Sequence, residues 1–329
     1  MENSEVFRQQ FEYFGLDVEF VREIYSPLAQ TLFYNLKDID DYNPKKISSI
    51  VEKMSVYSHV KLEWKKGTDT HIALTMFYNQ PKILLRQLMS EDNFRNIVVG
   101  KDIENNMVSI DFDKSPHILI AGTTGAGKSV LMNTIICNIY AWYGKNGNRF
   151  KMCDLVLIDP KGCEFDKYRN CVNTRFIDDT QQAINYLRSA CDEMDYRYKH
   201  METPHHDLFI VIDELADLML TSRFEVETSI VRLAQKGRAC GIHLILATQR
   251  PVVSVISGLI KANITTRFAL KVASIRDSIN IIDHKGAEEL NGNGDCLVKF
   301  PYSVNEVRCQ LAFADNELIQ KVVEVYSRR

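Results

Sequence analysis

The octet GTTGAGKS at residues 122–129 constrains the fold of this chain more than any other feature. The apolar segment HILIA comes directly before it, and the helix-like stretch SVLMNTIICNIY begins at its last residue. Glycines allow a tight turn in which backbone N–H groups point inward, and the first turn of the helix adds a partial positive charge. Strand, glycine-rich loop and helix in this order predict a loop that binds the phosphates of a nucleotide.

Each part of this loop has an expected task. Lys128 is expected to bridge the β- and γ-phosphates of ATP, and the hydroxyl of Ser129 to hold Mg²⁺. A glycine-rich turn can also arise by chance, but here both flanking segments have the character that a phosphate loop requires. The residues expected to contact ATP are Gly122, Thr123, Thr124, Gly125, Ala126, Gly127, Lys128, Ser129 and Val130.

Two further apolar strands end in polar residues. LFIVIDE at residues 208–214 ends in Asp213 and Glu214. Asp213 is expected to order the water around Mg²⁺, and Glu214 to polarise the water that attacks the γ-phosphate. The alternative, an acidic strand end that only faces solvent, is less favoured beside a phosphate loop. HLILATQ ends in Gln249, which either senses the γ-phosphate or only caps the sheet.

The chain divides into two parts. Residues 1–96 mix short helical and alternating segments without a chemical motif, which predicts a small α/β accessory domain. Residues 97–329 begin with a hairpin pattern at 98–112 and continue as apolar strands separated by helices, which predicts a mostly parallel sheet covered on both faces. The expected strands are 117–121, 155–159, 208–213, 243–247 and 266–272, and the expected helices are 128–142, 180–198, 224–240 and 252–262.

One more strand end, in the segment IDPKG, carries Asp159 and Lys161. It falls on the rim of the sheet where open α/β folds bind ligands, so a functional and a structural role are equally open for both residues.

The composition excludes several other classes. The chain has 329 residues, no apolar run long enough to span a membrane and no signal-peptide layout at its N-terminus. Its eight cysteines include no CxxC pair, so neither a zinc site nor a disulfide framework is expected, and the thiols are interpreted as reduced and intracellular. A net charge of −3 argues against a protein that is basic over its whole surface.

The charges are nevertheless unevenly distributed. The segment 232–276, the basic tract, has eight Lys and Arg residues and no Asp or Glu. A confined basic surface predicts contact with phosphates, either those of a neighbour's ATP or those of a polynucleotide. Arg267 and Lys271 are better explained as residues at sheet ends. Because aromatic residues do not alternate with these cations, a duplex backbone is favoured over stacked single-stranded bases. The functional candidates are Arg238, Arg250, Lys261 and Arg276.

Several stretches resemble the motor of the FtsK/SpoIIIE DNA translocases. In order they are HILIAGTTGAGKSVLMN, LVLIDPKGCEF, DEMDYRYKHM, IVIDELADLM, RLAQKGRACGIHLILATQRP, GLIKANITTRFALKV and GAEELNGNGDCLV, and they cover about residues 97–326. The resemblance implies a RecA-like P-loop NTPase core preceded by a small domain. It also implies a homo-hexameric ring that pumps double-stranded DNA at the expense of ATP.

The resemblance also assigns roles within the basic tract. Arg238 corresponds to the arginine finger that reaches the neighbouring subunit's site, and Arg250 and Lys261 correspond to pore-loop residues that grip DNA phosphates. A second pore loop is expected near residues 273–279. Here Ile275 and Ile279 occupy positions where the family tends to carry basic residues, and only Arg276 between them is a candidate DNA contact.

Two features of many family members, membrane-anchoring helices and a C-terminal winged-helix module, are not found in this sequence. We therefore expect either an isolated motor or a member that works without sequence guidance in the cytoplasm, with any membrane association supplied by partners or missing segments. The partner would be a relaxase and a transfer channel in conjugation, or division-channel proteins in chromosome segregation. The alternative is a ring ATPase of type VII secretion, of the EssC/EccC group, which moves proteins. The tract ATQRP…GLIKANI favours DNA.

Overall fold

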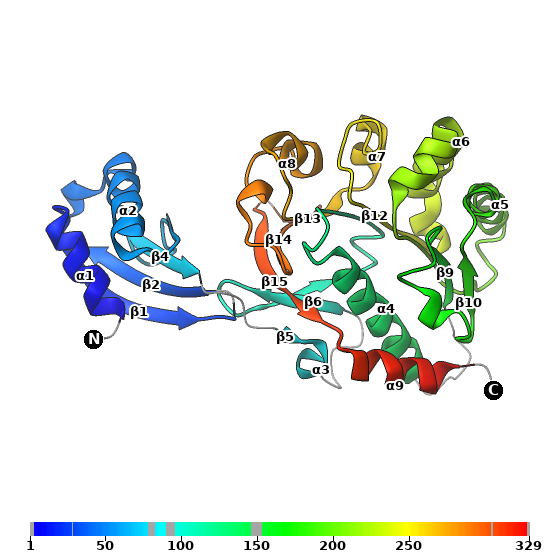
Figure 1. Ribbon diagram of the computed structural model, residues 1–329, viewed down its shortest axis with the longest axis horizontal. Helices are drawn as coiled ribbons and strands as arrows, with labels where there is room; N and C mark the ends of the chain where they lie inside the picture. Colours follow the sequence, from blue (N-terminus) through cyan, green and yellow to red (C-terminus); the bar gives the residue numbers. More distant parts are fainter. Residues whose placement is uncertain are drawn as a thin grey trace. The chain divides into compact units, whose positions relative to one another are not determined.

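The computed structural model describes residues 3–27, 29–77, 83–89, 96–145, 153–303 and 305–327, and their contacts divide the chain into two compact units (Figure 1). The first unit comprises Met1–Lys82 with Lys101–Met107, and the second comprises Ile83–Gly100 with Val108–Arg329. The sequence analysis placed the division between residues 96 and 97. By contacts, Ile83–Gly100 groups with the second unit.

The first unit is an antiparallel sheet with two helices. The strand order is β1 (Val18–Tyr25), β2 (Ala29–Leu36), β4 (Ile72–Phe77) and β3 (Leu62–Lys65). Helices α1 (Asn3–Tyr13) and α2 (Pro44–Ser58) share its core through Phe11, Tyr34 and Met54. The side chain of Asn43 caps α2, and His59 ends it in the left-handed conformation. The alternating segments predicted around residues 59–64 and 71–77 form β3 and β4.

The second unit is built on one large sheet. Its parallel part runs in the order β10 (Thr174–Ile177), β9 (Asp154–Ile158), β11 (Leu208–Ile212), β12 (Ile242–Thr248), β8 (His117–Ala121) and β13 (Thr266–Leu270). It continues through the antiparallel strands β14 (Asp295–Lys299) and β15 (Val307–Phe313) to β6 (Ile97–Asp102) and β7 (Met107–Ile110). The short strand β5 (Ile83–Leu84), followed by α3 (Leu85–Leu88), also pairs with β15.

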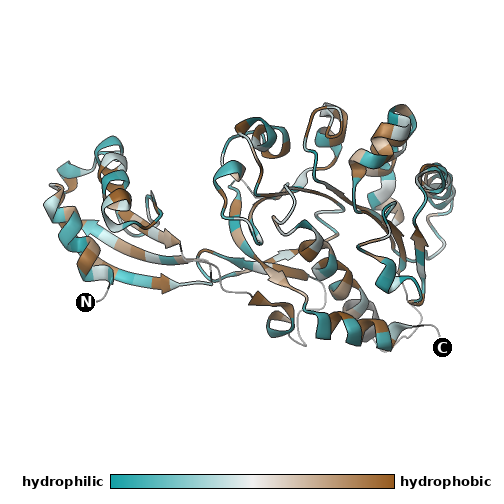
Figure 2. Ribbon diagram, viewed as in Figure 1, coloured by the Kyte–Doolittle hydropathy of each residue, from teal (hydrophilic) through white to brown (hydrophobic). Residues whose placement is uncertain are grey.

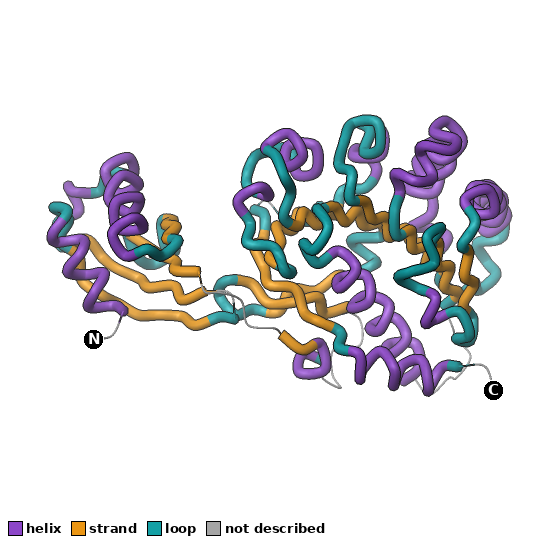
Figure 3. The backbone as a smooth tube through the Cα atoms, viewed as in Figure 1, coloured by secondary structure: helices purple, strands orange, loops and turns teal. Residues whose placement is uncertain are grey.

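Helices cover both faces of this sheet, which explains why its central strands are buried almost throughout and mostly apolar (Figures 2 and 3). In β8, Ile118 and Ile120 belong to one hydrophobic cluster, whereas Leu119 and Ala121 belong to the other. One face carries α4 (Lys128–Lys145) and α9 (Asn316–Tyr326). The other carries α5 (Thr180–Lys199), α6 (Leu215–Lys236), α7 (Gly258–Asn263) and α8 (Ile275–Ile282) (Figure 1). The predicted α/β architecture is confirmed.

Two predicted helices differ in part from the structure. The helix expected at 224–240 corresponds to the second half of α6, which follows the non-helical Ser222. The first half, from Leu215, was not expected; its first turn is capped by the carboxylate of Glu214, which accepts a hydrogen bond from the N–H of Ala216. Helix α6 ends in the 3-10 turn η3 (Gly237–Cys240). The helix expected at 252–262 is reduced to α7, which begins only where the hydroxyl of Ser257 accepts from the N–H of Ile260.

The hairpin predicted at 98–112 is formed by β6 and β7. Its turn is closed by Asp102, whose carboxylate accepts the N–H groups of Glu104 and Asn106, while Asn105 adopts a left-handed φ of 68°. In the described part of the chain, no helix is long and apolar enough to cross a membrane.

The buried ring of His117 at the start of β8 should make the stability of the protein depend on pH. Its Nδ1 accepts the N–H of Leu244 at 3.2 Å, which requires a neutral ring, and burial together with the nearby His243 lowers the pKa of His117 to about 3. The unfolded chain binds this proton at a pKa of about 6.5. Stability from this ring is therefore complete above that pH and is lost as the pH falls toward 3, by at most about 1.4 kcal/mol per pH unit.

Urea unfolding of the wild type and of His117→Gln between pH 4.5 and 7.5 checks this. The variant should be less stable at pH 7.5, and the difference should shrink as the pH falls. His206→Gln, which removes an exposed ring, should follow the wild type. A difference between wild type and His117→Gln that stays constant with pH would show that the ring titrates normally.

Candidate nucleotide site and basic surfaces

The parallel register places the ends of four strands on one rim of the sheet. Ala121 of β8 pairs with Thr248 of β12, and Ile212 of β11 pairs with both Leu246 and Ile158. The segments that follow these strands include the phosphate loop, the acidic pair at 213–214, Gln249 and the loop that begins at residue 159. The four motifs that the sequence analysis singled out at strand ends therefore share one rim.

The loop at residues 122–127 has the backbone of an anion cradle. Gly125 and Gly127 adopt φ values of +79° and +111°, which L side chains rarely adopt. A Cβ on Gly125 would meet no atom within 4 Å, whereas one on Gly127 would lie 2.8 Å from the nitrogen of Gly294. The loop is also tied to its neighbours, since the N–H of Thr123 donates to the carbonyl of Lys271 at 2.9 Å. A rigid, glycine-lined turn that leads into a helix suits the phosphates of a nucleotide.

Lys128, the first residue of α4, is engaged with Asp213. Its Nζ donates to the carbonyl of Asp213 at 2.9 Å and to Oδ1 at 3.0 Å, and the two residues are only 4% and 5% exposed. Burial raises the pKa of Asp213, and the ammonium of Lys128 opposes that shift. The predicted lysine and the predicted magnesium residue therefore lie together as a buried ion pair, within reach of the loop.

The hydroxyl of Ser129 lies in a contact that the sequence did not indicate. Its Oγ donates to Oε1 of Glu164 at 2.7 Å. Glu164 belongs to the loop after β9, in which Asp159 accepts the N–H groups of Gly162, Glu164 and Phe165 at 2.7 to 3.1 Å. Asp159 is fully buried and anchors this loop, so the structure gives it a structural part. Val130, in the first turn of α4, is half-buried.

Glu214 and Gln249 meet on the other side of the loop. The buried carboxylate of Glu214 accepts from the hydroxyl of Thr248 at 2.6 Å and from the N–H of Gln249 at 2.8 Å. The hydroxyl of Thr124 in the phosphate loop donates to Oε1 of Gln249 at 2.7 Å. The structure thus places Gln249 against the loop, as expected for a residue that detects the γ-phosphate.

Arg238 lies at the opposite end of the strands, where the parallel strands begin. It belongs to η3, directly before β12, whereas the phosphate loop lies beside the last residue of that strand. β12 has seven residues, so about 20 Å of extended strand separates the two. Arg238 is exposed and lines a cavity of about 570 Å³ with Phe112, Tyr198 and His243 among others. The structure does not bring Arg238 to the chain's own phosphate loop.

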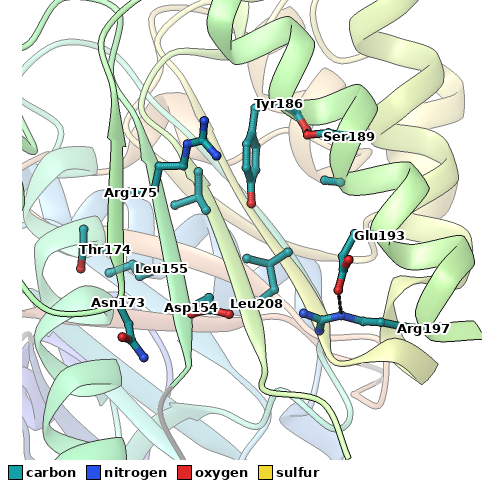
Figure 4. Close-up of a pocket in the computed structure, with 12 residues that line it drawn as sticks. Asp154, Leu155, Asn173, Thr174, Arg175, Tyr186, Ser189, Glu193, Arg197 and Leu208 are labelled. Atoms are coloured by element: carbon teal, nitrogen blue, oxygen red, sulfur yellow. Dashed lines mark hydrogen bonds and ion pairs between the residues drawn. The ribbon is translucent and has the colours of Figure 1, made fainter. Parts of the chain in front are cut away.

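A second cavity, of about 490 Å³, also lies at the amino ends of the strands (Figure 4). β9, β10, β11 and α5 enclose it, and the ion pair of Arg197 with Glu193, at 2.8 Å, forms part of its wall. None of its lining residues belongs to the predicted site. The cavity is therefore separate from the nucleotide rim.

The candidate DNA contacts lie on three neighbouring segments. Arg250, in the loop after β12, and Arg276 on α8 are exposed. The amide of Asn280 on α8 donates to the carbonyl of Pro251 at 2.8 Å, which links α8 to the loop after β12. Lys261 on α7 is instead paired with Asp283 at 2.8 Å.

Asp283 gathers three cations. Lys261, Arg267 and Lys299 all approach its carboxylate within 2.7 to 2.9 Å. Burial alone would raise the pKa of Asp283, but these hydrogen bonds hold it well below its usual range. Arg267 is buried and also donates to three backbone carbonyls, which agrees with the structural role favoured for it.

A profile of the FtsK/SpoIIIE family matches residues 83–206 and 201–253. The chain is 41% identical over 254 residues to the DNA translocase FtsK of Leptospira interrogans, which covers 70% of this chain and 26% of the relative. It is 42% identical over 267 residues to the DNA translocase SftA of Bacillus subtilis, which covers 73% and 28%. The chain belongs to the FtsK/SpoIIIE family. It spans about a quarter of the length of these two relatives.

Solved structures place this FtsK/SpoIIIE chain among P-loop ATPase folds. The conjugation coupling protein TcpA of pCW3, in a monomer form with ATPγS, matches with a TM-score of 0.68 and 21% identity over 99% of both chains. The cytoplasmic domain of the type VII secretion ATPase EccC of Thermomonospora curvata matches with a TM-score of 0.59 and 23% identity, over 73% of this chain and 32% of that one. At these identities the likeness shows the fold alone. The RecA-like P-loop architecture is confirmed, and the fold does not separate movement of DNA from movement of protein.

The buried pair of Lys128 and Asp213 should be strongly coupled. Lys128→Met leaves a buried carboxylate without its partner and should lower the free energy of unfolding by about 3–5 kcal/mol at pH 8 without nucleotide. Adding Asp213→Asn to that variant should recover much of the loss. Since removal of the ammonium raises the pKa of Asp213 further, the single variant should be less destabilised at pH 5 than at pH 8.

Chemical denaturation of the four members of this double-mutant cycle measures the coupling. Additive effects of the two substitutions would contradict a buried ion pair.

Proposed function

We propose that this FtsK/SpoIIIE chain is an ATP-driven motor that moves double-stranded DNA as a homo-hexameric ring. One observation carries the proposal. The phosphate loop, Asp213, Glu214 and Gln249 lie on the rim where the parallel strands finish. Arg238 lies at the other end of the strands, where they begin. A subunit built in this way has a nearly complete site on one side and an exposed arginine on the other. Its site is completed when the arginine of a neighbour is added.

The residues of the nucleotide rim fit ATP and Mg²⁺. The backbone N–H groups of residues 125–129 are proposed to bind phosphate oxygens, and Lys128 to exchange Asp213 for the β- and γ-phosphates. Ser129 and Asp213 would hold Mg²⁺, either directly or through water. The bound ion would neutralise part of the negative charge of the phosphates.

Glu214 is the proposed catalytic base. It is 3% exposed and is held by the hydroxyl of Thr248 and the N–H of Gln249. Those donors fix its carboxylate for orienting the attacking water. Because Gln249 also contacts Thr124 in the phosphate loop, a change at the γ-phosphate would be felt directly at Glu214.

DNA is favoured as the cargo by the relatives at about 40% identity, which are named DNA translocases. The proposed contacts are Arg250, Lys261 and Arg276. Arg250 and Arg276 are exposed, whereas Lys261 must exchange Asp283 for a phosphate. We therefore expect Arg250 to contribute more than Lys261. Most of the second pore loop expected near residues 273–279 is the start of helix α8 in the structure, where Ile275 and Ile279 are 52% and 46% exposed and offer no charge to DNA.

The proposed setting is conjugative transfer, in which the motor would hand DNA from a relaxase to a channel. Its support is the fold of the conjugation coupling protein TcpA, which matches this chain over 99% of both lengths. The alternative cargo, a protein as in type VII secretion, rests on the likeness to EccC over 73% of this chain.

Complementation should establish that Arg238 acts on a neighbour. Arg238→Ala and Lys128→Ala should each abolish ATP hydrolysis, the first without loss of nucleotide binding. A mixture of the two should regain part of the activity, because a Lys128→Ala subunit still presents Arg238 to the intact phosphate loop of its neighbour. Hydrolysis rates across mixing ratios measure this. A mixture as inactive as its components, in rings seen by electron microscopy, would contradict action in trans.

Duplex DNA should stimulate hydrolysis at low salt, and Arg250→Ala should reduce that stimulation more than Lys261→Ala. Each lost phosphate contact should also lower the slope of log affinity against log salt by about 1. Arg188→Ala, which removes an exposed cation paired with Glu225 outside the basic tract, is the matched control and should behave like the wild type. Rings of the wild type that hydrolyse ATP without any response to DNA would favour a protein cargo.

A further inference from the structure

The contact between Ser129 and Glu164 is not used by the proposed chemistry. Glu164 lies 35 residues from Ser129 in the chain, and its carboxylate accepts the serine hydroxyl at 2.7 Å in a half-buried position. We propose that Glu164 is a positioning residue that orients the hydroxyl of Ser129 as a ligand for magnesium. This inference rests on the proposed function, because it concerns how the same site would take Mg²⁺ with ATP.

The chemistry of a hydroxyl explains why such a partner matters. A serine hydroxyl has one hydrogen to donate and two lone pairs. To act as a metal ligand it must direct a lone pair to the cation and its hydrogen elsewhere. Inside a helix the usual recipient is a backbone carbonyl one turn earlier, but Ser129 is the second residue of α4 and has no helical turn before it. Glu164 receives the hydrogen instead, so a lone pair of Oγ remains available to the cation.

The loop that carries Glu164 is rigidly built. Asp159 accepts the N–H of Glu164 at 2.7 Å and is itself fully buried. Further along, the hydroxyl of Tyr168 donates to the side chain of Asn133 at 2.9 Å, and the amide of Asn133 donates to the carbonyl of Ser129 at 2.8 Å. The loop is thus fixed to the first turns of α4 at two levels, which holds the carboxylate at a set distance from the hydroxyl.

The donor set suits magnesium with phosphate. Ser129, Asp213 and Glu164 offer hard oxygen atoms from three different segments. Within the described ranges, however, no three His, Cys, Asp or Glu side chains gather closely enough to hold a metal by themselves. An ion here would depend on nucleotide oxygens and water for its remaining ligands, which is the usual state of Mg²⁺ in phosphate sites. Glu164 is then a partner of the serine and not a dedicated ligand.

Nucleotide binding with and without magnesium tests the inference. Calorimetric titration of ATPγS is done in EDTA and at increasing Mg²⁺ for the wild type, Glu164→Met and Glu164→Ala, because glutamine would keep a carbonyl oxygen that can accept the serine hydrogen. In EDTA all three should bind alike. Adding Mg²⁺ should raise the affinity for ATPγS less in the variants than in the wild type, by a factor of about ten or more. This is the usual size of such indirect effects on metal affinity. Asp166→Asn, an exposed acid of the same loop paired with Arg169, should behave like the wild type.

A Ser129→Ala background separates positioning from other roles. If Glu164 acts through the hydroxyl, Glu164→Met should change little once Ser129 is already alanine. An undiminished effect in that background would overturn the inference, and so would a gain in Mg²⁺-dependent affinity in Glu164→Met, which would mean that Glu164 competes with the ion. Should Glu164→Ala fail to fold, Glu164→Met, which keeps the length of the side chain, carries the comparison.

Failure of this inference is distinguishable from failure of the proposed function. If the wild type binds ATPγS and gains affinity with Mg²⁺ while Glu164→Met does the same, only the role of Glu164 is wrong. If the wild type does not bind ATPγS at all, or binds it as well after Lys128→Ala, the nucleotide site itself is wrong.

Discussion

The arrangement of the second unit depends on the parallel register of β9, β11, β12 and β8. Parallel strands end on the same side of a sheet, and helices on both faces allow these strands to be mostly apolar. Four loops therefore converge on one rim, although their residues are far apart in the sequence. The same constraint places the start of β12, with Arg238 just before it, at the opposite end of the strands. The separation of the site from the arginine follows from strand direction alone.

Much of this could be predicted because the signals were local. The phosphate loop between an apolar strand and a helix, and the acidic pair after LFIVI, fix both the element type and the direction of the chain at the site. The contact between Ser129 and Glu164 had no such signal, since it joins segments 35 residues apart. The early start of α6 was missed for a related reason. Glu214 was interpreted as catalytic, and the sequence pattern gave no separate sign that it also caps the first turn of α6.

The basic tract illustrates what composition alone leaves open. Eight cations without an acid between them indicated an anion-binding surface, yet Asp283 lies only seven residues beyond the tract and gathers two of its members, Lys261 and Arg267. A linear count of charges does not detect an acid that returns to the tract at the end of α8. Arg250, Arg276 and Arg238 remain exposed. These three exposed arginines are therefore divided between the loop after β12 with α8 and the end of the sheet that carries η3.

Helix α6 runs from the end of the sheet where the parallel strands finish to the end where they begin. It begins at Glu214, which caps its first turn at the nucleotide rim, and it leads directly into η3, which carries Arg238. The residue proposed to activate water in one site and the residue proposed to serve the neighbouring site are thus the two ends of one element. Ser222, whose backbone is not helical, interrupts it, so the two halves meet at a kink. In the proposed ring, a displacement of Glu214 on loss of the γ-phosphate would have to pass through both halves of this helix to reach Arg238.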